Sequence, residues 1–163
     1  MPQTNQSHEP LEKETAPANE TRRRAMAAFA IADTDLLADS WQAIGGSATA
    51  TRLRGPEAGL VMLRGRIGGG GAPFNLGEAS VTRATVRLGS GEIGHAMVLG
   101  RDLERAELAA TFDAAFQRRE WRERIAAEIV EPVLAAQAED DLQRAEETQA
   151  TRVDFFTVVR GED

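Results

Sequence analysis

The residues with the clearest chemical potential lie in the centre of the chain. Arg64 and Arg66 precede four successive glycines, Gly68–Gly71. Arg83 and Arg87 follow on the next predicted strand. Glycines let the backbone approach a ligand closely, and the consecutive N–H groups of such a loop can form an anion-binding nest. Because guanidinium groups bind phosphate in a bidentate manner, this segment is a candidate site for a phosphate-bearing ligand.

The same segment departs from the standard nucleotide-binding patterns. It has neither Walker A spacing nor G-x-G-x-x-G, and a strand rather than a helix follows it. The single lysine, Lys13, lies far from it. Two interpretations therefore stay open, a flexible connector or interface loop and a phosphate site. In either case the candidate substrate or interface residues are Arg64, Arg66, Gly68, Gly69, Gly70, Gly71, Asn75 and Arg83.

His95 and Glu78 are the candidate acid–base residues. His95 lies within the strand-like run Glu92–Val98, and histidine titrates near neutral pH, although a lone strand histidine is more often structural. Glu78 has the chemistry of a base, or of an ion-pair partner for a nearby arginine. With two histidines in the chain, one of them in the polar leader, and no cysteine, the sequence predicts no metal site. No serine lies in G-x-S-x-G, so the set of catalytic groups is incomplete and favours a ligand-binding or assembly subunit.

Composition narrows the class of protein. The 163 residues are 42% hydrophobic, which suits one globular domain. There is no apolar run of about 20 residues and no secretory signal, so we expect a cytoplasmic protein without a membrane segment. The net charge of -7 argues against nucleic-acid binding. A nucleic-acid-binding module that uses Arg22–Arg24 and the central arginines stays as a third alternative.

The N-terminal third is expected to be helical after a leader. Residues 1–19 are polar and proline-containing, which predicts a disordered leader, and residues 20–163 are expected to form a single domain. Helical spacing begins at Glu20. A second short helix follows Asp33, a good N-cap residue, and ends at Gly45–Gly46.

The middle of the chain has strand patterns. Leu60–Leu63 is a short apolar run after a predicted turn at Gly55–Pro56. Residues 78–88 alternate between two faces, and Gly89–Gly91 connects them to Ile93–Leu99 as a hairpin.

Helices and a last strand follow. Asp102 is a good N-cap for a helix through Phe116, and helical spacing resumes at Trp121, with Pro132 expected to kink or restart it. Residues 138–149 are charged and expected to be exposed, whereas Val153–Val159 has the composition of a strand. The predicted fold is α+β: an antiparallel sheet of hairpin strands plus a C-terminal strand, flanked by N-terminal and central helices.

Several ordered blocks carry a resemblance to a known family. They are Leu60–Arg66, Gly71–Glu78, Val81–Arg83, Gly94–Asp102 and Thr151–Glu162. Through them the chain, from about residue 20 to its end, resembles the PhnG family, small subunits of the carbon–phosphorus lyase core complex in bacterial phosphonate metabolism. The resemblance implies PhnH, PhnI, PhnJ and the ABC-type protein PhnL as partners.

The resemblance also implies a reaction for the assembly. A phosphonate displaces adenine from ATP to give α-D-ribose 1-methylphosphonate 5-triphosphate, a transferase step for which ATP with Mg is the substrate of the complex. In the family, nucleosidase chemistry is associated with PhnI and radical chemistry with PhnJ. It therefore implies a subunit that binds no cofactor alone and is not catalytic alone. The alternative is an autonomous enzyme that uses His95 and Glu78 on a phosphorylated substrate.

Overall fold

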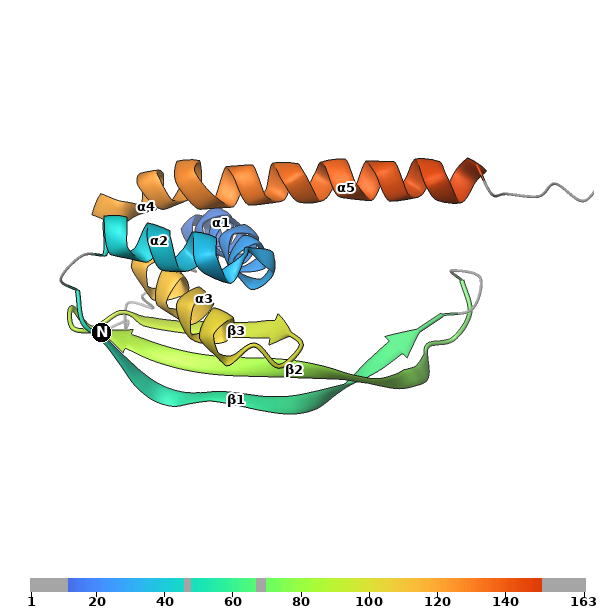
Figure 1. Ribbon diagram of the computed structural model, residues 1–163, viewed down its shortest axis with the longest axis horizontal. Coiled ribbons are helices and arrows are strands. Elements are labelled where there is room, and N and C mark those ends of the chain that lie inside the picture. Colours follow the sequence, from blue (N-terminus) through green and yellow to red (C-terminus); the bar gives the residue numbers. More distant parts are fainter. Residues whose placement is uncertain (1–11, 46–47, 67–69, 151–163) are drawn as a thin grey trace, which may run out of the picture.

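The computed structural model describes residues 12–45, 48–66 and 70–150. A three-stranded antiparallel sheet forms one layer, and the helices lie together on one of its faces (Figure 1). The predicted α+β class is confirmed. The predicted C-terminal strand, Val153–Val159, lies outside the described residues.

The strands follow one another along the sheet in the order β1 (Ala50–Gly65), β2 (Phe74–Leu88) and β3 (Ile93–Leu99). The predicted hairpin between β2 and β3 is confirmed, with Val86 opposite Gly94. Strand β2 starts at Phe74, before the predicted position 78, because pairing with β1 continues to the end of that strand.

Strand β1 is much longer than the predicted Leu60–Leu63. The predicted turn at Gly55–Pro56 is instead an irregularity inside the strand, where pairing passes from Arg54 opposite Thr85 to Glu57 opposite Arg83. Gly55 has φ +67°, and a Cβ atom there would lie 2.5 Å from the carbonyl oxygen of Arg83. A local glycine signal was therefore interpreted as a turn where the chain only bulges.

Three helices lie between the sheet and the last helical elements of the chain (Figure 1). They are α1 (Glu12–Ile31), α2 (Thr34–Ile44) and α3 (Leu103–Phe116). Residues 12–19, predicted as part of a disordered leader, are helical instead; they are rich in Glu, Lys and Ala, which are strong helix formers. Asp102 caps α3 as predicted by accepting a hydrogen bond from the Arg105 N–H at 2.9 Å. Asp33 occupies the N-cap position of α2, but its side chain makes no capping hydrogen bond.

The last helical elements form one nearly continuous rod. Helix α4 (Arg119–Ile125) passes through a π-helical segment (Ala126–Val130) into α5 (Glu131–Ala150). Pro132 lies in the first turn of α5, which fits the predicted restart at this proline. No residue described for α5 is buried, and Figure 1 shows the helix running out beyond the other helices.

The core lies between the helices and the inner face of the sheet. On β2 the alternate residues Thr82, Ala84, Val86 and Leu88 are buried, whereas Arg83 and Arg87 are exposed. Aromatic rings of Phe29, Trp41, Phe112 and Phe116 make tilted or edge-on contacts above this layer. The predicted alternation of β2 thus separates a core face from a face that no described helix covers.

Candidate functional site

The central candidate residues lie on a long two-stranded arm. Strand β3 ends opposite Val81, and β1 and β2 continue past it as a ribbon. We define the arm as residues 60–65 paired with residues 74–80. Arg64 lies opposite Asn75 near its tip, and the Arg66 Nη1 donates a hydrogen bond to the Gly71 carbonyl oxygen at 3.2 Å. Gly68 and Gly69 lie outside the described residues.

Arg83 lies apart from this tip. It is opposite Glu57 in the body of the sheet, and its Nη2 is 3.5 Å from the Glu57 Oε1. Eight residues separate Arg83 from Asn75 on β2, roughly 26 Å at the rise of an extended strand. A phosphate cradle formed jointly by the tip and Arg83 is therefore not present. Arg64, Arg66, Gly70, Gly71 and Asn75 do lie together at the exposed tip.

The two acid–base candidates do not converge. The His95 Nδ1 lies 3.1 Å from the Thr85 Oγ1, on the face of the sheet away from the core. Glu78 lies opposite Met62 on the arm, seven residues from Thr85 and thus about 23 Å away. Strand alternation also puts Glu78 and His95 on opposite faces. Glu78 is exposed, and the ion pairs among the described residues do not include it.

A small hollow lies beside His95. Its volume is about 260 Å³, and its lining residues are Met26, Arg54, Arg83, Ala84, Thr85, His95, Ala96 and Met97. Glu57 lies within ion-pair distance of both of these arginines, at 2.9 Å from Arg54 and 3.5 Å from Arg83. The carboxylate offsets part of the positive charge that an anionic ligand would require.

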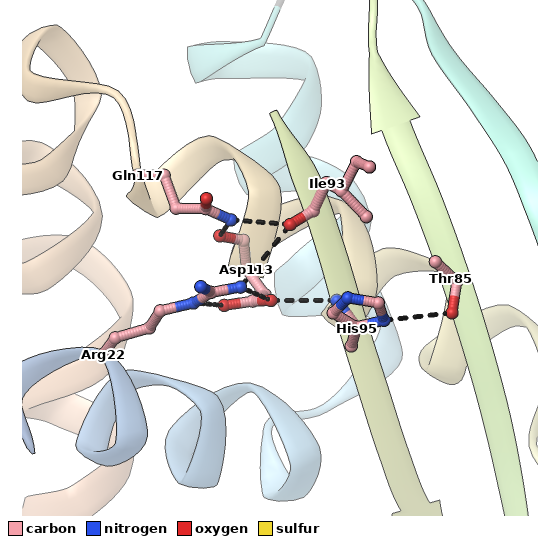
Figure 2. A network of polar contacts seen from close by, with 6 residues as sticks. All are labelled: Arg22, Thr85, Ile93, His95, Asp113 and Gln117. Atoms are coloured by element: carbon pink, nitrogen blue, oxygen red, sulfur yellow. Dashed lines mark hydrogen bonds and ion pairs between the residues drawn. The ribbon is translucent and has the colours of Figure 1, made fainter. Parts of the chain in front are cut away.

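The polar cluster around Asp113 was not predicted (Figure 2). The Asp113 carboxylate is 1% exposed and accepts two hydrogen bonds from Arg22, at 2.8 and 2.7 Å. It also accepts the backbone N–H of His95 at 2.8 Å. Gln117 donates to the carbonyl oxygen of Ile93 at 2.8 Å. The cluster thus fastens the edge strand β3 to α1 and α3.

Electrostatics and sequence separation explain both the strength of this cluster and why it was missed. The hydrogen bonds to Asp113 raise the pKa of Arg22 above its ordinary value, so the guanidinium keeps its charge at any pH at which the protein folds.

Arg22 and Asp113 are 91 residues apart. The only local signal was an acidic residue among the apolar positions of α3, because Asp113 interrupts a run of buried residues.

The basic triplet that raised the question of nucleic-acid binding is paired with carboxylates. Arg22 contacts Asp113, Arg23 contacts Glu20 at 3.1 Å, and Arg24 contacts Glu131 at 2.9 Å. These contacts tie α1 to α3 and to the start of α5. The triplet therefore stabilises the helical layer and presents little free positive charge.

Two further properties concern the described part of the chain as a whole. Among residues 12–45, 48–66 and 70–150, no helix has the length and apolar character of a membrane span. Within the same ranges, His, Asp and Glu side chains form no group of three suited to holding a metal ion.

Comparison with known proteins agrees with the resemblance. The family model for phosphonate metabolism protein PhnG matches residues 20–161. The chain is also similar to the α-D-ribose 1-methylphosphonate 5-triphosphate synthase subunit PhnG of Rhizobium meliloti (strain 1021), with 55% identity over 142 residues. That alignment covers 87% of this chain and 90% of the relative. The arm, the sheet and the helices, except for residues 12–19 of α1, lie within the region that the family model matches, and the chain belongs to the PhnG family of phosphonate metabolism proteins.

Proposed function

We propose that this chain is a subunit of a synthase that makes α-D-ribose 1-methylphosphonate 5-triphosphate during phosphonate catabolism. In this reaction a phosphonate displaces adenine from ATP. The proposal is supported by the similarity of this chain to a relative that is named as a subunit of this synthase. The two sequences are 55% identical, and the alignment covers 90% of the relative's length.

The arm is the structural observation that carries the proposal. Beyond Val81 neither strand of the ribbon has a third neighbour among the described residues, and Leu60, Met62 and Leu76 are exposed there. Two-stranded ribbons are marginally stable in water, and large exposed apolar patches are typical of protein interfaces. The arm thus supports a role through contact with other subunits rather than through catalysis by this chain alone.

The proposal extends to the surroundings of the chain. Its partners are the core subunits PhnH, PhnI and PhnJ and the ABC-type protein PhnL, in the cytoplasm. ATP, with Mg, is the substrate of the assembly, and this chain contributes no cofactor of its own. Arg64, Arg66 and the glycine loop at the arm tip contact either a partner or the triphosphate.

Growth on methylphosphonate tests the proposal. A strain that lacks this gene is complemented with the wild-type gene, with Arg66→Ala or with Gly70→Val. A Cβ atom at Gly70 meets no other atom within 4 Å, so the valine should not disturb the fold. We expect both variants to slow growth markedly, because they alter the tip that contacts the assembly.

Arg23→Ala is the matched control, since Arg23 forms only an exposed ion pair with Glu20. It should complement fully. Wild-type growth with both tip variants would remove the loop from the proposal. Failure of the wild-type chain to co-purify with the other core subunits would contradict the proposal as a whole.

A further inference from the structure

The side of the sheet that points away from the helices carries an unusual set of side chains. We define this side as the outer face. The His95 side chain lies on it, and residues directly opposite one another in an antiparallel sheet share a face. Arg54 is opposite Thr85, which is opposite His95, so Arg54 belongs to the outer face as well. Alternation along β2 adds Arg83 and Arg87.

The part of the outer face at and next to the arm is apolar. Pairing has no register shift within residues 57–63 of β1 or 93–99 of β3, which places Leu63, Val81, Met97 and Leu99 on this face. Val81 is 5% exposed, yet it lies outside the cluster of buried residues between the helices and the sheet. Leu63, Met97 and Leu99 are 42%, 52% and 69% exposed. These residues therefore form a separate apolar region on the side of the sheet that no described helix covers.

Strand β3 shows the same feature along its whole length. Its large apolar side chains, Ile93, Met97 and Leu99, point outward, whereas Gly94 and Ala96 point toward the helices. When one face of an antiparallel sheet is solvated, the outward positions are usually polar. This strand instead has the composition of one that is covered on both faces, and exposed apolar regions of this kind are typical of protein interfaces.

The rest of the outer face has an excess of positive charge. It carries Arg54, Arg83 and Arg87, and Glu57 is the carboxylate that the described residues place there. Glu57 lies 2.9 Å from Arg54 and 3.5 Å from Arg83, while the ion pairs among the described residues do not include Arg87. Three arginines against one carboxylate leave two positive charges, in a protein whose net charge is -7. The arginine triplet of α1, by contrast, is paired residue by residue.

We propose that the outer face docks on another subunit, whose surface is apolar opposite Met97 and Leu99 and carries Asp or Glu opposite Arg83 and Arg87. The inference rests on the proposed function, which supplies the partner subunits, and it adds a contact surface distinct from the arm tip. A carboxylate of the partner would accept bidentate, charge-assisted hydrogen bonds from a guanidinium group. Covering the apolar side chains would remove them from water.

Charge disfavours three other occupants. A second copy of the chain would bring the same excess of arginines to a face-to-face contact, and like charges across an interface repel each other. Nucleic acid and an anionic lipid surface would match the arginines, but the net charge of -7 repels both from the molecule as a whole.

The length of the chain after α5 limits what that segment can cover. Val159 is nine residues beyond Ala150, so an extended chain places it at most about 32 Å away. Helix α5 is about 30 Å long, and Figure 1 shows its last turn at the arm end of the molecule, away from the end of β2. A path back along α5 and past the helical layer and the sheet, each about 10 Å thick, is longer than this reach. The apolar residues of this segment therefore cannot extend to Arg87.

The apolar contact is tested with the full chain co-expressed with the other core subunits, one of which carries an affinity tag. Leu99→Glu puts a charge at an exposed position of the outer face. We expect the amount of this chain that co-purifies to fall by at least about tenfold, as for a residue at the centre of an interface. Leu142→Glu is the matched control, because Leu142 is 67% exposed on α5, and it should co-purify at the wild-type level.

The charge of the contact is tested at Arg87. Arg87→Glu should lower co-purification more than Arg87→Gln does, because it places a carboxylate against the partner's carboxylate. Arg119→Glu changes the net charge equally at an exposed position of α4 and should co-purify at the wild-type level. Equal co-purification of the two Arg87 variants would show that no carboxylate lies opposite Arg87. A loss with Arg119→Glu as large as with Arg87→Glu would show that net charge, and not this face, controls assembly.

Oxidation of Met97 by hydrogen peroxide identifies the occupant, with mass spectrometry as the readout. Because Met97 is 52% exposed, it should oxidise readily in the isolated chain and several-fold more slowly in the assembly. Faster oxidation of the isolated chain after removal of residues 151–163 would overturn the proposal in favour of this chain's own segment. Protection in a dimer of the isolated chain that Leu99→Glu dissociates would overturn it in favour of a second copy. Protection by vesicles that contain phosphatidylserine would do so in favour of a lipid surface.

The outcomes also separate this inference from the proposed function. If the wild-type chain does not co-purify with the core subunits, the proposed function itself fails. If the wild-type chain, Leu99→Glu and Arg87→Glu all co-purify equally and Met97 stays reactive in the assembly, the outer face is not an interface, and the subunit role is unaffected.

Discussion

At the scale of single residues, Asp113 is the buried charge that holds the edge strand β3. Its carboxylate is 1% exposed and accepts hydrogen bonds from Arg22 and from the backbone of His95. Removing one member of a buried ion pair leaves the other without compensation. Arg22 keeps 35% of its side chain exposed, so water moderates that cost.

We therefore expect Asp113→Ala to lower the free energy of unfolding by about 2–4 kcal/mol. Urea denaturation of the purified chain measures this change. Asp140→Ala provides the control, because Asp140 pairs with Arg144 at 3.2 Å on an exposed face of α5 and should contribute less than about 1 kcal/mol. Equal effects of the two substitutions would show that the cluster around Asp113 is not a stabilising centre.

At the scale of elements, the packing of β3 on α3 depends on the absence of a side chain at Gly94. A Cβ atom there would lie 2.0 Å from the Ala110 carbonyl oxygen and 2.4 Å from the Ala114 nitrogen. Both are backbone atoms of α3, so neither can move aside without moving the helix.

Gly94→Ala should therefore destabilise the chain by about 3 kcal/mol or more, as overpacking of a core does. Gly70→Ala should leave the thermal midpoint nearly unchanged, because nothing lies within 4 Å of a Cβ atom at Gly70. Thermal unfolding followed by circular dichroism compares the two variants. A stable Gly94→Ala protein would mean that β3 and α3 are farther apart than the structure indicates.

The range over which a residue makes its contacts explains which elements the sequence could predict. Local signals, such as the Asp102 cap and the Gly89–Gly91 turn, gave α3 and the β2–β3 hairpin correctly. The length of β1 was missed because a Gly-Pro pair has the same local pattern in a turn and in a bulge. Gly94 gave no warning, since its closest neighbours are 16 and 20 residues further along the chain.

The candidate site was predicted only in part, for a similar reason. Arg64, Arg66 and Asn75 are brought together at the arm tip by the pairing of two neighbouring strands. His95 and Glu78 were grouped because both carry acid–base chemistry, but the sheet separates them. The Arg22–Asp113 pair joins distant segments, and neither residue has a local pattern that identifies the other.

At the scale of the whole molecule, the helices cover the body of the sheet, and the arm projects beyond β3 (Figure 1). The body contains the buried aromatic and aliphatic residues, whereas the large exposed side chains of the arm have no such cover. Substitutions in the two regions should therefore affect different properties of the protein. Those at the buried residues of the body should change folding, and those on the arm should change assembly.

Partner titration should separate the two classes of variant. A partner that binds only the folded chain stabilises it by about 2.7 kcal/mol at a concentration of 100 times the dissociation constant. Wild-type protein and Gly94→Ala should both gain this amount, the latter from a lower starting stability, because the arm is unchanged. Leu76→Lys should start near the wild-type stability, because Leu76 is exposed, and should gain much less, since the arm that contacts other subunits then carries a charge. Thermal unfolding at several partner concentrations measures the gain, and an equal gain for all three proteins would mean that docking occurs elsewhere on the molecule.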